Sequence, residues 1–370
     1  MRSLLSLAKF FLVVVIVVGM CAPAFAANPN EDLLKTKGVA AGLFKVKTKA
    51  EMAAKERKLN KRGKAEFAKA KNAHKKLRDA TFDIAPNETL NQDPKDLLGI
   101  AGLPDPKHAE KQNAENRKNE KAIKDQLKAK GVDTSMLDFS YKLILRPVIP
   151  SYFNTSICTP VKNQGGCGSC WAFAATAAFE HSYKKFYGAT LNLSEQDAVA
   201  CGKTCANADC GSCGGGHSYK AFDFMKCKKI SNEVYYPYNI SRSNNCYSKQ
   251  KTNAVYYWGA LPYTDGRDPN KRNLIKNYVN TYGAVVTYLK AGVSTFTGYG
   301  GGVYNGYPSS TNGPIDHAVI IVGYSDALGA WIIKNSWGTN WGPYGGYGWV
   351  SYNACNIGKY VYYAFPKRGL

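Results

Sequence analysis

Three short segments, far apart in the chain, present a cysteine, a histidine and an asparagine in that order. They are Gln164-Gly-Gly-Cys-Gly-Ser-Cys-Trp171, which contains Cys170, then Asp316-His317-Ala318, and finally Lys334-Asn335-Ser336-Trp337. A thiol attacks well only as a thiolate, and a neighbouring imidazole can take its proton. An amide that accepts a hydrogen bond from the imidazole would fix the orientation of the ring. Such a set works only in a fold that joins the early and late halves of the chain at one site.

These segments resemble the papain family of cysteine proteases, whose histidine and asparagine follow the cysteine by about 130–150 residues. His317 follows Cys170 by 147 residues and Asn335 follows it by 165, as one inserted loop would produce. The resemblance begins near Pro147 and extends to the C-terminus. Its further matches are Pro160–Gln164, Leu193–Gln196, Cys213–Gly216, Tyr236–Tyr238 and Asn335–Gly342. The order and spacing of these segments make the resemblance specific.

The resemblance implies an α+β fold of two domains, with the active-site cleft between a helical left domain and a strand-rich right domain. The residues agree with this expectation. From Cys170 onward the sequence is apolar almost all round, which predicts a buried helix that begins near the nucleophile. Later, short runs such as 284–289 and 318–322 predict strands bounded by glycine turns.

By resemblance, Cys170 is the nucleophile and His317 is first its base and then an acid. Asn335 would orient the imidazole, and Trp337 would shield that hydrogen bond from water. Gln164 matches the family's oxyanion donor, together with the backbone N–H of Cys170. Removal of one such donor costs about 10²–10³ in rate in measured cases.

Alternative readings of these residues are weaker. Cys170 could form a redox pair with Cys167, but a thioredoxin-like unit needs a βαβ context that this sequence lacks. The part of the chain that resembles the enzyme has three histidines. His181 lies eleven residues past Cys170, about 16 Å along the same predicted helix, too far to touch the thiol. His217 follows the turn at residues 214–216, and a purely structural role is the alternative for His317.

Substrate binding is predicted from a second group of positions. Gly215 and Gly216 match the family's glycine pair, whose backbone holds an extended substrate. His217 and Ser218 stand where many members have an aromatic residue and a proline, so the preference for a bulky aliphatic side chain is in doubt. The remaining predicted substrate-binding residues are Tyr288, Ile315, Asp316 and Trp337.

The resemblance implies the disulfides Cys167–Cys213 and Cys201–Cys246. Cys205 and Cys210 add a small loop, and the pairing of Cys158, Cys205, Cys210, Cys227 and Cys355 stays open. Without Cys21 and Cys170 an odd number of cysteines remains, so at least one thiol is free or bonded between chains. No metal site and no cofactor are predicted, because the papain-like motifs explain the cysteines better than zinc does.

The N-terminal part divides into two predicted segments. Residues 1–26 read as a secretory signal peptide, with Arg2 and Lys9 before the apolar run 10–20 and a small-residue cleavage site at 24–26. A membrane anchor is the alternative, although the run is too short to span a bilayer. Residues 27–143 read as a propeptide before a protease domain at 144–370, with the boundary between 140 and 150.

The propeptide is expected to be mainly helical and to run backwards through the cleft, as in the family. Residues 48–80 are strong helix formers. A second helical stretch at 107–130 has so little apolar content that it is expected to be solvent-exposed or disordered. A basic interaction module is the alternative for this part of the chain.

We therefore expect a cysteine endopeptidase, made as a zymogen, that hydrolyses peptide bonds through a Cys170 acyl-enzyme. The short link from Cys227 to Tyr236 leaves no room for the long insertion that converts cathepsin B to dipeptide removal. The expected partners are peptide or protein substrates, the chain's own propeptide and cystatin-like inhibitors, and the protein is expected to be a monomer. No nucleic acid partner and no membrane span after signal removal are expected.

Entry into the secretory pathway is expected, with secretion or a lysosome- or vacuole-like compartment as the destination. Four tripeptides match the glycosylation signal, at Asn87, Asn154, Asn192 and Asn239. Two rival functions stay open. One is a non-catalytic binding protein with the papain fold. The other is polyanion binding by the lysine-rich N-terminal part, which the formal net charge of +22 permits.

Overall fold

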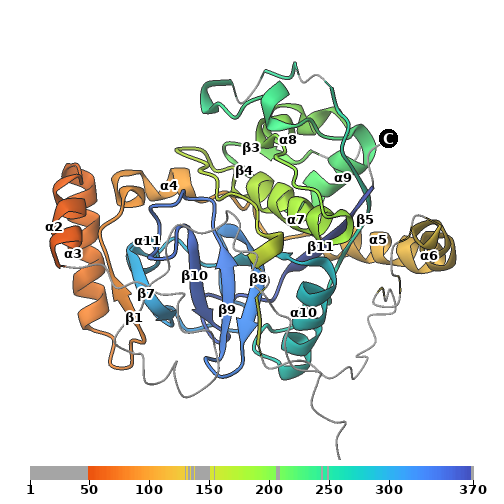
Figure 1. The fold of residues 1–370 in the computed structure, drawn as a ribbon. Helices are drawn as coiled ribbons and strands as arrows, with labels where there is room; N and C mark the ends of the chain where they lie inside the picture. The colour runs from red at the N-terminus through yellow and green to blue at the C-terminus, as the bar shows by residue number, and fades with distance from the viewer. Residues whose placement is uncertain are drawn as a thin grey trace, which may run out of the picture.

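A helical layer lies against a nine-stranded sheet, and an N-terminal segment extends along both (Figure 1). The computed structural model describes residues 49–129, 131, 134, 137, 151–153, 155–205, 209–242, 245–247 and 250–367. The expected α+β fold with a helical part and a strand-rich part is confirmed. The expected signal peptide at 1–26 and the boundary at 143/144 lie outside the described residues.

The helical layer is built around one long central helix. This helix, α7 (Cys170–Tyr187), ends where Gly188 adopts a left-handed conformation with φ of 71°, which glycine reaches without steric cost. Around it lie α8 (Glu195–Cys201), α9 (Ser218–Lys228) and the two short strands β3 (Gly211–Ser212) and β4 (Gly215–Gly216). Single 3₁₀ turns connect them: η2 (Thr155–Ile157), η3 (Gly202–Thr204), η4 (Glu233–Tyr235) and η5 (Ile240–Arg242).

The sheet has the strand order β1-β7-β10-β9-β8-β6-β11-β5, and β2 pairs with β8 beside this path. All its pairs are antiparallel except β7 with β10. Its strands are β2 (Ser151–Phe153), β5 (Ala254–Ala260), β6 (Val285–Leu289), β7 (Tyr299–Tyr304), β8 (His317–Ser325), β9 (Ala330–Lys334), β10 (Tyr347–Ser351) and β11 (Val361–Lys367), with β1 (Phe82–Ile84) from the N-terminal segment. Helices α10 (Pro269–Tyr282) and α11 (Ser294–Thr297) flank it. The strands predicted at 284–289 and 318–322 are confirmed as β6 and part of β8.

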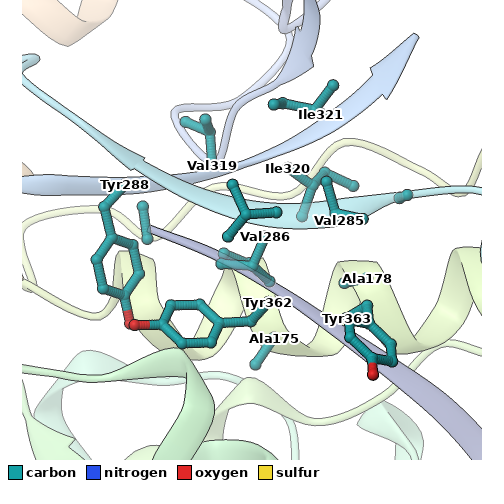
Figure 2. Packing of buried hydrophobic residues seen from close by; sticks show 14 of the residues in the cluster. Ala175, Ala178, Val285, Val286, Tyr288, Val319, Ile320, Ile321, Tyr362 and Tyr363 are labelled. Atoms are coloured by element: carbon teal, nitrogen blue, oxygen red, sulfur yellow. The ribbon is translucent and has the colours of Figure 1, made fainter. Parts of the chain in front are cut away.

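The main core lies between α7 and the sheet. Figure 2 shows Ala175 and Ala178 of the helix beside Val286 of β6 and Tyr362 of β11. All four side chains are at most 1% exposed. Alanines on this face let the helix approach the strands closely, while large tyrosines fill the space beside it. The approach brings the start of α7, and therefore Cys170, to the start of β8.

The N-terminal segment folds into two separate groups of helices. The first group contains α2 (Lys49–Arg57), α3 (Lys61–Lys75), the 3₁₀ turn η1 (Glu88–Asn91) and α4 (Pro94–Leu97), and its strand β1 pairs with β7. The second contains α5 (Pro106–Lys118) and α6 (Glu120–Lys128). The predicted helical character of 48–80 is thus confirmed for 49–57 and 61–75, while residues 58–60 and 76–80 are not helical.

Residues 107–128 are ordered as α5 and α6, so the expected disorder is wrong, whereas most of their side chains are solvent-exposed as the alternative expectation had it. These helices bury five side chains, Ala109, Gln112, Asn116, Ile123 and Leu127. Two of the five are amides, which a count of apolar residues overlooks. Their burial is possible because the amides form hydrogen bonds where they pack, as buried polar groups must.

Three disulfides cross-link the helical part. Cys167–Cys213 and Cys201–Cys246 are the two pairs implied by the resemblance. The third joins Cys205 to Cys227, so Cys205 and Cys210 do not close a loop together. Cys158, Cys170, Cys210 and Cys355 remain as buried thiols.

The glycosylation signals differ in exposure. Asn87 is 3% exposed and its side chain donates to the Thr297 carbonyl at 2.9 Å, so this asparagine is unsuited to carry a glycan in the folded chain. Asn192 and Asn239 are exposed, and Asn154 lies outside the described residues. Within the part of the chain that the structure describes, no helix is long and apolar enough to cross a membrane.

We expect Ile321→Ala to lower the free energy of unfolding of the full-length chain by about 2–5 kcal/mol, because it leaves a cavity in the buried core beside β8. Ile321 is fully buried. The matched control is Ile240→Ala, since Ile240 is 43% exposed and its loss should change stability by less than about 0.5 kcal/mol. Urea denaturation followed by tryptophan fluorescence measures both. Equal effects of the two variants would contradict this assignment of the core.

Candidate active site

Cys170 is the first residue of α7 and its side chain is fully buried. The positive end of a helix dipole favours a thiolate at this position. Burial nevertheless dominates and raises the pKa of the Cys170 thiol to about 12, while contacts with the backbone N–H groups of Ala318, Trp171 and Gly99 act in the opposite direction. The contact with Ala318 places the thiol beside the strand that His317 begins. The thiol is therefore held in its neutral form in this structure.

His317 begins β8, and its Nε2 lies 2.8 Å from Oδ1 of Asn335. The indole ring of Trp337 lies over the imidazole, with ring centroids 4.6 Å apart. Burial lowers the pKa of His317 to about 4, although the hydrogen bond with Asn335 acts in the opposite direction. Because Asn335 occupies Nε2, the other ring nitrogen is the one available to a thiol. That nitrogen, Nδ1, has no hydrogen-bond partner among the described residues.

The side chain of Gln164 is fixed at both of its polar atoms. Its Oε1 accepts a hydrogen bond from the Ser336 hydroxyl at 2.7 Å. Its Nε2 donates to the Cys167 carbonyl at 2.9 Å and to the Leu97 carbonyl at 3.1 Å. Leu97 belongs to the N-terminal segment, so the predicted oxyanion donor already holds a peptide carbonyl.

Residues 97–101 of the N-terminal segment occupy the space between the two parts of the fold. Gly99 N–H donates to the Asp316 carbonyl at 3.0 Å, and the Gly99 carbonyl accepts from Gly216 N–H at 2.9 Å. Ile100 pairs with Gly216 as a parallel bridge. A Cβ on Gly99 would lie 2.0 Å from the Gly168 carbonyl oxygen, so a glycine is required here. A backbone this close to the catalytic helix excludes any other peptide.

The structure gives the predicted substrate residues different surroundings. Gly215 and Gly216 face the segment in the cleft, and the backbone of Ala101 contacts the His217 ring. Tyr288 is fully buried, and its hydroxyl accepts from Ser218 N–H at 2.8 Å. The Ser218 hydroxyl in turn donates to the Trp171 carbonyl at 2.8 Å, and Ile315 is half-buried at the edge of the core. The polar groups of Ser218 and Tyr288 thus form hydrogen bonds with the protein itself and are not directed at a ligand.

Asp316 has a partner that the sequence reasoning missed. Lys290 Nζ lies 2.5 Å from Asp316 Oδ2, and the backbone N–H of Ala291 donates to Oδ1 at 2.7 Å. These contacts fix Asp316, the residue that precedes His317. The backbone carbonyl of Asp316 is also the group that accepts a hydrogen bond from Gly99 N–H. Lys290 directly follows a predicted strand, but no local pattern indicated the ion pair. Gly99 and Ser336 were missed for the same reason, since only the fold brings them to Cys170 and Gln164.

A buried charged network lies below the candidate site. Lys162 Nζ contacts Glu180 at 3.2 Å and Glu195 at 2.8 Å, and both carboxylates are 1% exposed. Lys334 Nζ joins the network through the Thr159 hydroxyl at 2.7 Å. Lys334 ends β9 and directly precedes Asn335, so the network connects α7 to the strand that carries the asparagine. In the described ranges no group of three or more metal-ligating side chains comes together.

The comparisons with known proteins agree with this geometry. The family described as "Papain family cysteine protease" matches residues 151–365. A "Cysteine protease" of Blomia tropicalis is 35% identical over 56% of this chain and 62% of its own length. "Cathepsin K" of Gallus gallus is 38% identical over 50% of this chain and 54% of its own length. The chain thus spans less than two thirds of the length of these relatives.

A solved structure extends the match beyond residues 151–365. The digestive procathepsin L 3 of the Tenebrio molitor larval midgut aligns with 86% of this chain and 94% of its own, at a TM-score of 0.61 and 23% identity. At this identity the likeness concerns the fold alone, and it includes helices before the protease domain. With a family match over more than half of its length, the chain belongs to the papain family of cysteine proteases.

Proposed function

We propose that the chain is the zymogen of a cysteine endopeptidase. Cys170 attacks the carbonyl of a peptide bond, His317 takes the thiol proton and passes it to the leaving amine, and water then hydrolyses the thioester. The observation that carries the proposal is the buried hydrogen bond between His317 Nε2 and Asn335 Oδ1, at 2.8 Å. It leaves Nδ1 for the thiol and fixes the plane of the ring.

Gln164 is proposed as the oxyanion donor. Support comes from its contact with a peptide carbonyl, that of Leu97, at 3.1 Å. A side-chain N–H that is already oriented needs no reorganisation when charge develops on a substrate oxygen. Ser336 orients the amide by its hydrogen bond to Oε1.

Gly215, Gly216, His217 and the backbone of Asp316 are proposed to bind the substrate as an extended strand. The contacts of residues 99–101 with Gly216 and Asp316 support this role, because a substrate needs the same backbone partners. The family resemblance implies that a substrate runs in the opposite direction. The segment in the cleft continues into α4 on one side and α5 on the other, and a site that a longer chain passes through favours cleavage within a chain.

Residues 27–143 are proposed as the inhibitory propeptide, although the cleavage position itself falls outside the described residues. Inhibition follows from residues 97–101, which cover Cys170 and occupy the backbone N–H of Gly216 that a substrate would need. We also propose secretory entry, secretion or a lysosome-like destination, a monomeric protease and binding of cystatin-like inhibitors. These proposals rest on the sequence and the family resemblance.

We expect Cys170→Ala to abolish cleavage of fluorogenic peptides by the processed enzyme, since it removes the proposed nucleophile. Cys158→Ala is the matched control, because Cys158 is also a buried thiol and its carbonyl accepts a hydrogen bond from Lys184, near the end of α7 remote from Cys170. Its activity should equal that of the unmodified protein. Undiminished cleavage by Cys170→Ala, or absence of cleavage by the unmodified enzyme at every pH from 4 to 7, would favour a non-catalytic binding protein.

Gln164→Ala should lower kcat by about 10²–10³, as does the loss of an oxyanion donor in other hydrolases. Ser336→Ala should have a smaller effect, because it removes only the group that orients the amide. Steady-state kinetics with one peptide substrate separates the two. A loss that appears in KM alone for Gln164→Ala would contradict the oxyanion role.

Alkylation of Cys170 by iodoacetamide should be slow at neutral pH in the full-length chain. Burial raises the pKa of the thiol, so little thiolate forms below alkaline pH and the rate should rise as the pH rises. Removal of the N-terminal segment should shift this profile to lower pH, since water and the imidazole then reach the thiol. Mass spectrometry of the Cys170 peptide measures the rate. Identical profiles before and after processing would contradict latency by coverage.

A further inference from the structure

Helices α5 and α6 cover the outer edge of β5, the last strand of the sheet. The strand order ends at β5, so one row of its backbone groups has no neighbouring strand. Proteins often cover such an edge with a helix or loop, because a bare edge can pair with another chain. In Figure 1, α5 and α6 lie beside β5 on the side of the molecule remote from α2 and α3. The N-terminal segment therefore contacts the protease domain at two distant places.

Two asparagines of α5 replace the missing strand. Asn113 Nδ2 donates to the Ala260 carbonyl at 2.8 Å, and its Oδ1 accepts from Ala260 N–H at 3.1 Å. Asn116 Nδ2 donates to the Trp258 carbonyl at 2.7 Å. Residues 258 and 260 present their backbone groups to the same edge, and positions 113 and 116 share one face of the helix. One helix face thus binds both backbone polar groups of Ala260 and the carbonyl of Trp258.

Side chains next to this edge add charge and aromatic contacts. His108 Nε2 lies 2.6 Å from Asp223 Oδ2, and the other oxygen of Asp223 accepts from Trp258 Nε1 at 2.7 Å. The His108 ring stacks on the Trp258 indole, with centroids 5.8 Å apart and an interplanar angle of 18°. Lys226 of α9 pairs with Glu115 of α5 at 3.1 Å. These charged and aromatic contacts require particular side chains on α5, so the surface is specific for a helix of this sequence.

We propose that the outer edge of β5, with Asp223 and Trp258, is a docking surface for a helix that carries asparagines three positions apart. Its occupant is residues 106–128 of this chain, docked independently of the segment in the cleft. Residues 97–101 are then held from both sides, by β1 on β7 and by α5 on β5. Two linked contacts bind more tightly than either alone, because the second binding step is intramolecular. This surface uses none of the proposed catalytic residues.

The test uses the full-length Cys170→Ala chain, so that its outcome does not depend on hydrolysis. A recognition sequence for a specific protease, inserted between residues 138 and 150, allows the chain to be cut there. Size-exclusion chromatography and surface plasmon resonance then measure how fast the N-terminal fragment leaves. Hydrogen exchange, read by mass spectrometry, reports the protection of the Ala260 amide.

We expect Asn113→Ala to accelerate both release of the fragment and exchange of the Ala260 amide by about tenfold, because two hydrogen bonds to the strand edge are lost. Asn113→Asp keeps an acceptor for Ala260 N–H but sets a carboxylate oxygen against the Ala260 carbonyl, so it should also accelerate both rates. Lys121→Ala is the matched control on α6, where the side chain is 93% exposed, and should change neither rate.

Gly99→Ala separates the two anchors. The added Cβ would lie 2.0 Å from the Gly168 carbonyl oxygen, so it should displace the cleft segment and speed release while the Ala260 amide stays protected. Two results would overturn the proposal. One is unchanged release and exchange in Asn113→Ala. The other is exposure of the Ala260 amide by Gly99→Ala to the same extent as by Asn113→Ala.

Discussion

The packing of α7 on the sheet is the contact on which the rest of the structure depends. Small alanines on the buried face of this helix let it lie close to β6, β8 and β11. That approach sets the start of the helix, and so Cys170, beside the first residues of β8, where His317 stands. The charged network of Lys162, Glu180 and Glu195 reinforces the same junction from below.

The proposed latency follows from the same junction. One extended backbone occupies the space between the two parts of the fold, and a Cβ on its Gly99 would lie 2.0 Å from the carbonyl oxygen of Gly168, two residues before α7 begins. Burial then favours the neutral forms of both the thiol and the imidazole, because low-dielectric surroundings disfavour charge. In the proposed zymogen the covering segment would therefore block substrate and also suppress the ion pair on which a thiol nucleophile depends.

The N-terminal segment also completes the sheet. Its strand β1 pairs with one edge of the sheet at β7, and its helix α5 covers the other edge at β5. Both edges of the protease sheet are thus occupied by residues that precede the protease domain. An edge that carries unpaired N–H and C=O groups is a ready binding surface, which explains why polar helices with few apolar residues can be held firmly there.

The sequence by itself determined the family, the fold class and the identity of the residues proposed for catalysis. Cys170, His317 and Asn335 each stand in a distinctive local segment, and the apolar runs at 284–289 and 318–322 predicted β6 and the middle of β8. Only the tertiary structure decided the burial of α5, the Cys205–Cys227 bond, the Lys290–Asp316 pair and the use of Gly99 in the cleft. The physical reason is range: a local pattern records propensity and chemistry, whereas these contacts join residues that only the folded chain brings together.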